Sequence, residues 1–311
     1  MPKPILVTTS SFSASSPQPK EELLRQGLEV HENPHKRKLT EDEVLSLLRG
    51  LRPVGMIAGL EPLTARVLQE AKGHLRVISR CGTGLENVDL SAAEGCGIRV
   101  FNTPEAPSQA VAELAVGLML AVLRRIAEAD RALRAGTWKA LPGSLLGDKT
   151  VGIVGLGRIG SRVLSICRGF GCQGLTHDAA PIRAEGARSV SLDELIANSD
   201  VVSLHCPLAP ATRGLIGGPA LARMRKGAVL INTSRGGLID EAALQEALAA
   251  GRLAGAGLDV FESEPYTGPL LGLPNVVLTP HMGSGAKECR VRMESEASDN
   301  LIKGLRAAGE L

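Results

Sequence analysis

The run Gly155-Leu156-Gly157-Arg158-Ile159-Gly160 constrains the fold of this chain more than any other feature. It follows an apolar run at residues 151–154, which predicts a strand, and it opens a helical pattern at residues 158–170. The first glycine permits a tight turn, the second lets the backbone approach a pyrophosphate, and the third lets helix and strand pack closely. The N–H groups at the start of that helix attract phosphate. The run therefore predicts a dinucleotide site in an α/β unit, although a glycine turn without a ligand is the structural alternative.

Asp178 favours NAD over NADP as the dinucleotide. It ends the next predicted strand, residues 174–177, close to the spacing of about 20 residues found in such units. Its carboxylate can accept hydrogen bonds from the ribose hydroxyls and would repel a 2′-phosphate. Arg183, a few residues further on, argues weakly for NADP.

Apolar runs alternate with helical patterns along the chain, which predicts parallel sheets connected by crossover helices. The sequence Thr40-x-x-Glu43 is a capping box that predicts a helix through Leu48. A long helix is predicted over residues 108–135 and another over residues 285–308. Strands are predicted at residues 4–8, 54–58, 75–79, 98–101, 201–204, 228–231, 254–259 and 276–278, besides the two named above.

Composition excludes several classes of protein. A length of 311 residues suits two domains. A net charge of +2 and an aromatic content of 2% argue against a nucleic-acid partner. No apolar run approaches the roughly 18 residues that span a bilayer, and no signal peptide is visible, so we expect a cytoplasmic protein without a membrane partner. The six cysteines lack the spacing of zinc ligands, so no metal site is predicted and reduced thiols are expected.

Arg235, Glu264 and His281 form the candidate catalytic set, because each follows a short apolar run. Ligands of open α/β sheets bind at the edge where such strands end. A guanidinium there can hold a carboxylate in a bidentate fork, and a histidine can accept a hydroxyl proton. A carboxylate on the other ring nitrogen would fix the tautomer. Singly, each could be structural, but together they predict hydride transfer to or from a small carboxylic acid.

These motifs together resemble the D-isomer-specific 2-hydroxyacid dehydrogenase family along nearly the whole chain. The resemblance implies an α/β fold of two Rossmann-like, doubly wound parallel-sheet domains separated by a cleft. Residues 101–283 would bind NAD, and residues 1–100 with 284–311 would form a substrate-binding lid. It also implies a homodimer formed through the cofactor domain and the helix after residue 108. The motifs that carry the resemblance, besides the glycine run, are Arg80–Asn87, His205–Leu208, Asn232–Gly237 with Asp240, Leu258–Pro265 and Pro280-His281.

The resemblance also assigns roles to residues. Arg235, Glu264 and His281 match the catalytic residues of the family, and Arg235 and His281 would also contact the substrate. The backbone N–H groups of Thr83 and Gly84 would hold the substrate carboxylate. Asp259 matches a position near the nicotinamide. The full set expected to bind the cofactor is Gly155, Gly157, Arg158, Ile159, Gly160, Asp178, His205, Cys206, Pro207, Thr212, Thr233, Ser234, Asp259 and Gly283.

The choice of acid is less constrained. The chain is most similar to short D-3-phosphoglycerate dehydrogenases, which implies oxidation of 3-phosphoglycerate to 3-phosphohydroxypyruvate in serine biosynthesis. However, Gly59 stands where those enzymes have an arginine that binds phosphate, and Glu61 nearby would repel phosphate. Pro107 also departs from the family pattern. Arg80 could replace the lost arginine or could merely anchor its own loop, and Lys139 is a weaker phosphate candidate.

Two alternatives to phosphoglycerate oxidation stay open. Loss of the phosphate arginine favours a reductase of glyoxylate, hydroxypyruvate or another small 2-keto acid. A non-catalytic NAD-sensing protein could share the same fold. The complete catalytic set argues against such a sensor, because a sensor needs no base with an orienting carboxylate.

Overall fold

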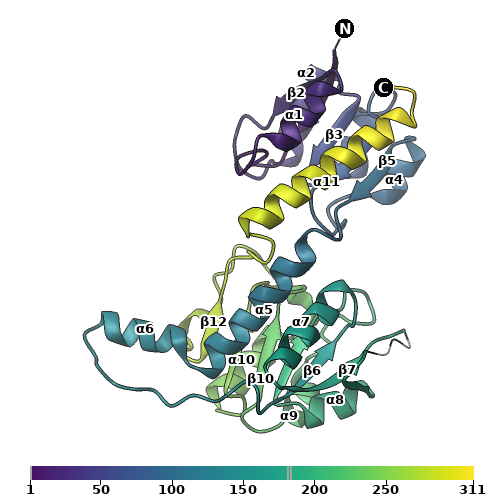
Figure 1. Cartoon of the computed structure of the whole chain (residues 1–311). Coiled ribbons are helices and arrows are strands. Elements are labelled where there is room, and N and C mark those ends of the chain that lie inside the picture. Colours follow the sequence, from purple (N-terminus) through teal and green to yellow (C-terminus); the bar gives the residue numbers. More distant parts are fainter. Residues whose placement is uncertain (1, 181, 183) are drawn as a thin grey trace. The chain divides into compact units, whose positions relative to one another are not determined.

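The computed structural model describes residues 2–180, 182 and 184–311 (Figure 1). The chain divides into two compact units, unit 1 with residues 1–107 and 284–311, and unit 2 with residues 108–283. Both units are parallel α/β structures, as predicted. The predicted boundary after residue 100 is wrong. It cuts strand β5 (Arg99–Asn102), and Asn102 pairs with Arg80 in the sheet of unit 1.

Unit 1 contains a five-stranded parallel sheet with the order β2-β1-β3-β4-β5. This order reverses between β1 and β3, which is where ligands of such sheets bind. Thr40 and Glu43 form the predicted capping box at the start of α2. Helix α11 packs against β3, β4 and β5 (Figure 1). The other elements of unit 1 are β1 (Lys3–Val7), α1 (Gln18–Arg25), β2 (Leu28–Glu32), α2 (Glu41–Leu51), β3 (Gly55–Ala58), α3 (Ala65–Glu70), β4 (Val77–Arg80), α4 (Leu90–Gly95) and α11 (Lys287–Arg306).

Unit 2 contains a seven-stranded parallel sheet with the order β12-β11-β10-β9-β6-β7-β8. The order reverses between β6 and β9, so the C-terminal ends of these two strands mark the expected ligand edge. The elements are α5 (Pro107–Leu123), α6 (Ile126–Arg134), β6 (Thr150–Val154), α7 (Arg158–Gly169), β7 (Gln173–His177), β8 (Ala187–Ser189), α8 (Leu192–Asn198), β9 (Val201–Leu204), α9 (Gly218–Arg223), β10 (Val229–Asn232), α10 (Glu241–Ala249), β11 (Gly255–Leu258) and β12 (Val276–Leu278), with short 3₁₀ helices at Gly236–Leu238 and Pro269–Gly272.

The single helix predicted over residues 108–135 is wrong, because the structure has two helices there. Helix α5 is apolar and buries Ala112, Ala115 and Met119 completely. It ends before Arg125, whose left-handed backbone (φ +52°) interrupts the helix. Helix α6 then runs away from the rest of unit 2 with no fully buried residue (Figure 1). Arg124 and Arg125, which follow Leu123 at the end of the apolar helix, therefore mark the break between the two helices.

Further observations concern membrane helices, metal sites and cysteines. Among the residues that the structure describes, no helix is long and apolar enough to cross a membrane, and no group of three His, Cys, Asp or Glu could hold a metal ion. All six cysteines are free thiols. Burial raises the pKa of Cys81 and of Cys167 to about 12, so these thiols are inert packing groups.

Candidate active site

The glycine run forms the turn between β6 and α7. Gly155 has a φ of +93°, and a Cβ there would lie 2.5 Å from the nitrogen of Cys206. A Cβ on Gly160 would lie 2.0 Å from the carbonyl oxygen of Gly155, so only glycine lets α7 start this close to the strand. Gly157 caps α7 without a side chain, which leaves the N–H groups of the first turn open to a pyrophosphate.

Asp178 lies directly against this turn. One carboxylate oxygen accepts from the N–H of Leu156 at 2.6 Å, and the other accepts from the N–H of Ala180 at 2.9 Å. The structure therefore brings together the two sequence features that predicted a dinucleotide. Arg183, the residue that argued for NADP, lies outside the described residues.

Two buried polar atoms at the ends of β9 and β10 have no partner within the described chain. They are Nδ1 of His205 and Oγ1 of Thr233, a residue that is only 7% exposed. Burial lowers the pKa of His205 to about 4, so its ring is neutral, and its Nε2 lies 2.8 Å from Oγ of Ser203. Orphaned polar atoms at the ligand edge of the sheet fit a bound dinucleotide, which would supply their missing hydrogen bonds.

The neighbouring predicted cofactor residues build the loops around this edge. The Ser234 hydroxyl donates to the carbonyl of Cys206 at 2.7 Å, which ties the β10 loop to the β9 loop. The Thr212 hydroxyl donates to the carbonyl of Pro207 at 2.7 Å and accepts from the N–H of Ala209. These contacts shape the loop after β9.

Arg235 follows β10 in a turn that Asn232 holds. The fully buried Asn232 side chain accepts from the N–H of Ser234 at 3.0 Å and donates to the carbonyl of Arg235 at 2.8 Å. The guanidinium of Arg235 donates to the carbonyl of Ser234 and remains partly exposed. The sequence motif contains Asn232 but does not predict its role, because its contacts depend on the shape of the turn.

Glu264 and His281 meet in the structure. Oε2 of Glu264 lies 2.7 Å from Nδ1 of His281, and Oε1 accepts from the N–H of Phe261 at 3.1 Å. The His281 side chain is 45% exposed, which leaves its Nε2 side accessible. This is the arrangement of an acid–base histidine with an orienting carboxylate.

Asp259 is almost fully buried and holds the turn that carries His281. Its carboxylate accepts from the Thr279 hydroxyl at 2.6 Å, from the N–H of Met282 at 2.8 Å and from the N–H of Gly283 at 2.8 Å. His281 has a φ of +51°, which is unfavourable for a residue with a side chain. The three hydrogen bonds to Asp259 stabilise this backbone. Asp259 therefore has a structural role in holding His281, in addition to the cofactor-binding role expected from the sequence.

The predicted substrate residues Arg80, Thr83 and Gly84 belong to unit 1. Arg80 is 9% exposed and donates to the carbonyl of Cys81 at 3.1 Å. Its guanidinium fills the space beside Gly82, where a Cβ would lie 1.3 Å from Nη1. Thr83 is exposed and Gly84 is partly exposed in the loop after β4.

Comparison with known proteins identifies the family of the chain. Residues 116–283, more than half of the chain, match the model of the D-isomer specific 2-hydroxyacid dehydrogenase NAD binding domain. The chain is 40% identical over 274 residues to the hydroxypyruvate reductase of Thermotoga maritima, covering 86% of this chain and 89% of that protein. It is 41% identical over 282 residues to the D-3-phosphoglycerate dehydrogenase of Methanocaldococcus jannaschii, covering 88% of this chain and 53% of that protein.

Solved structures agree as well. The TT0316 protein from Thermus thermophilus has a TM-score of 0.90 and 40% identity, covering 98% of this chain and 97% of that one. This chain spans nearly the whole hydroxypyruvate reductase but only about half of the phosphoglycerate dehydrogenase. The fold, the glycine turn and the matched sequences lead to one conclusion, that the chain belongs to the D-isomer-specific 2-hydroxyacid dehydrogenases, a family of NAD-dependent oxidoreductases that act on CH–OH donors.

Proposed function

We propose that Arg235, Glu264 and His281 catalyse the interconversion of a small 2-hydroxy acid and its 2-keto acid. NAD, when bound, accepts or supplies the hydride. His281 takes the hydroxyl proton during oxidation and returns it to the carbonyl oxygen during reduction. Arg235 binds the substrate carboxylate. The observation that carries this proposal is the 2.7 Å contact between His281 Nδ1 and Glu264 Oε2, which leaves Nε2 to face the substrate.

We infer further that the acid carries no phosphate. Glu61 is 1% exposed, and its carboxylate accepts from the N–H of Gly59 at 3.0 Å and from the Thr8 hydroxyl. A Cβ on residue 59 would lie 3.0 Å from Oε2 of Glu61, so this carboxylate occupies the place into which an arginine would extend. These residues follow β1 and β3, at the ligand edge of the unit 1 sheet. A carboxylate there disfavours a phosphate and favours hydroxypyruvate or glyoxylate.

Oxidation of 3-phosphoglycerate is the second candidate. It is favoured by the 41% identity to a D-3-phosphoglycerate dehydrogenase over 88% of this chain. It would require Arg80 to bind the phosphate, and the guanidinium of Arg80 already packs over Gly82. We therefore rank it below the unphosphorylated acids.

The deciding experiment is NADH oxidation, followed by absorbance, with hydroxypyruvate, glyoxylate and 3-phosphohydroxypyruvate. We expect kcat/KM for one of the unphosphorylated acids to exceed that for the phosphorylated acid by at least about tenfold, which corresponds to about 1.4 kcal/mol in transition-state binding. The reverse preference would establish the phosphoglycerate reaction. Bound NADH without turnover of any acid would support a sensor instead.

The catalytic assignment has its own test. His281→Ala should lower kcat by roughly 10²- to 10⁴-fold, because general acid–base catalysis is worth about that much. The dissociation constant of NADH, measured by fluorescence, should stay unchanged. Turnover at the original rate in this variant would refute the assignment of His281.

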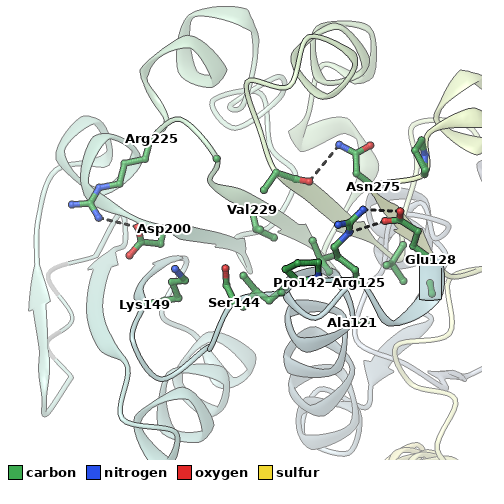
Figure 2. A pocket seen from close by; sticks show the side chains of 18 of the residues that line it. Ala121, Arg125, Glu128, Pro142, Ser144, Lys149, Asp200, Arg225, Val229 and Asn275 are labelled. Atoms are coloured by element: carbon green, nitrogen blue, oxygen red, sulfur yellow. Dashed lines mark hydrogen bonds and ion pairs between the residues drawn. The ribbon is translucent and has the colours of Figure 1, made fainter. Parts of the chain in front are cut away.

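We also propose that the protein is a homodimer and that a second copy covers the surface between residues 121 and 149. A groove of about 690 Å³ lies there, at the N-terminal edge of the unit 2 sheet (Figure 2). The pairs Arg225–Asp200 and Arg125–Glu128 lie at its two sides (Figure 2). Residues 121–149, of which both ends contribute to this groove, also carry large apolar side chains that face solvent, and Trp138 is 90% exposed. A second copy of this surface would bury such side chains. The exposed large apolar residues of this segment are Ile126, Leu133, Trp138 and Leu145.

A further inference from the structure

The turn that carries Glu264 is held from outside by Glu241. Phe261 and Glu262 form the peptide at the start of this turn. The N–H of Phe261 donates to the Glu264 carboxylate at 3.1 Å, and the N–H of Glu262 donates to Oε1 of Glu241 at 2.7 Å. The Phe261 N–H therefore helps to direct the Glu264 carboxylate toward His281. The next N–H of the same turn, that of Glu262, is held by Glu241 of helix α10.

The backbone that carries this anchor is fixed in a helix. Glu241 is the first residue of α10, and the side chain of Asp240 caps this helix by accepting from the N–H of Ala243. Leu244 and Leu248 bury the helix in the core of unit 2. A bond from a helix to a loop restricts the loop more than a bond within the loop would.

The peptide between Phe261 and Glu262 also packs against the backbone next to Arg235. A Cβ on Gly236 would lie 1.9 Å from the carbonyl carbon of Phe261 and 2.3 Å from the nitrogen of Glu262. The backbone beside Arg235 therefore lies directly against the backbone beside Glu264. The Phe261 and Tyr266 rings stack at 4.3 Å and close the turn from its far end.

We propose that Glu241 is a positioning residue for the dehydrogenase reaction, acting through the Glu262 N–H to aim Glu264 at His281. This inference rests on the proposed roles of Glu264 and His281. The other polar side chains near the turn bind elsewhere and not to the Glu262 N–H. Glu262 and Arg213 form an ion pair at 3.8 Å in which both side chains are more than 60% exposed. The Tyr266 hydroxyl accepts from the N–H of Leu270.

Two variants separate positioning from a simple effect on helix stability. Glu241→Gln keeps an oxygen that can accept from the Glu262 N–H but loses the negative charge at the helix start. Glu241→Asp keeps that charge but is one methylene shorter, so it cannot hold the 2.7 Å contact without moving the turn. A helix-dipole role would make the glutamine variant the impaired one. A positioning role makes the aspartate variant the impaired one.

The measurement is the separate change of kcat and KM for oxidation of the hydroxy acid that matches the best keto acid of the panel. A misaimed Glu264 would leave His281 poorly oriented for proton transfer, so the loss should fall on kcat, while the dissociation constant of NADH stays unchanged. We expect Glu241→Asp to lower kcat about tenfold, because a misaimed catalytic group is costly. Glu241→Gln should match the unmodified protein.

Two reference variants complete the design. Glu246→Ala removes an exposed carboxylate from the same helix and should change nothing. Glu264→Gln should lower kcat at least as much as Glu241→Asp, and if it does not lower kcat, the proposed catalytic pair and the inference from it both fail. If Glu264→Gln lowers kcat but Glu241→Asp does not, only the positioning role of Glu241 is refuted.

Discussion

At the scale of single residues, hydrogen bonds from buried side chains fix the turns that carry the proposed catalytic groups. Asn232 holds the turn of Arg235, and Asp259 holds the turn of His281. The sequence could predict which residue types matter, because chemistry limits the choice of base and carboxylate binder. It could not predict Glu241, since its partner is the backbone N–H of Glu262 in a different loop. Such contacts depend on tertiary structure and leave no local pattern.

His205 gives a residue-scale prediction about acid stability. Burial lowers the pKa of its ring from 6.5 to about 4. Between these values the unfolded chain binds a proton that the folded chain does not, so stability is lost as pH falls from 6.5 toward 4. The loss should reach about 2 kcal/mol at pH 5.

The comparison that checks this is urea unfolding at pH 7 and pH 5. In His205→Gln the loss of stability between these two pH values should be smaller by about 2 kcal/mol. His35→Gln is the matched control, because the His35 side chain is 42% exposed, and it should behave as the unmodified protein. Equal losses in all three proteins would contradict the prediction.

At the scale of elements, periodicity identified the strands at the centre of each sheet and missed weaker segments. Strands β1, β3, β4 and β9 coincide with predicted apolar runs, because their residues are buried on both faces. Edge strands β2 and β8 were not predicted, since their partly exposed residues dilute the apolar signal. The break before α6 was also missed. It depends on the left-handed backbone of a single residue, Arg125, and the helical sequence pattern continues on both sides of it.

Helix α7 gives an element-scale prediction, because its start must touch the glycine turn. In Gly160→Ala the new Cβ would meet the Gly155 oxygen at 2.0 Å and a methyl of Ile153 at 3.1 Å, and α7 would have to move away. We expect NADH binding to weaken at least about tenfold, since pyrophosphate binding uses the N–H groups of this first turn.

Calorimetric titration with NADH would measure the effect. Gly169→Ala at the other end of α7 is the matched control, because its Cβ would meet no atom within 4 Å. The control should bind NADH normally and gain stability of up to about 1 kcal/mol, as alanine is the better helix former. Equal NADH affinity in both variants would exclude close approach at Gly160 as the reason for the glycine.

At the scale of the whole molecule, the sequence predicted the two parallel-sheet α/β units but placed their first boundary too early. Motif spacing identifies the residues that meet at one edge of a sheet. A domain boundary depends instead on which strand is the last of the sheet, and here that strand is β5. Helix α6 gives the strongest support to the proposed homodimer. It is amphipathic, yet none of its residues is fully buried within the chain. A helix of this kind requires an apolar partner to be stable.

The homodimer proposal therefore makes a prediction about mass. The double variant Ile126→Glu and Leu133→Glu changes side chains that are 54% and 55% exposed, so the fold of a single chain should tolerate it. Carboxylates in a buried interface should shift the dimer toward monomer by several kcal/mol, because each would lose its hydration. Light scattering after size exclusion measures the mass of both proteins. Leu24→Glu is the control, since this residue is 50% exposed on α1 of unit 1, outside the surface proposed to be covered. A monomer before mutation, or a dimer that survives the double variant, would contradict an interface built on α6.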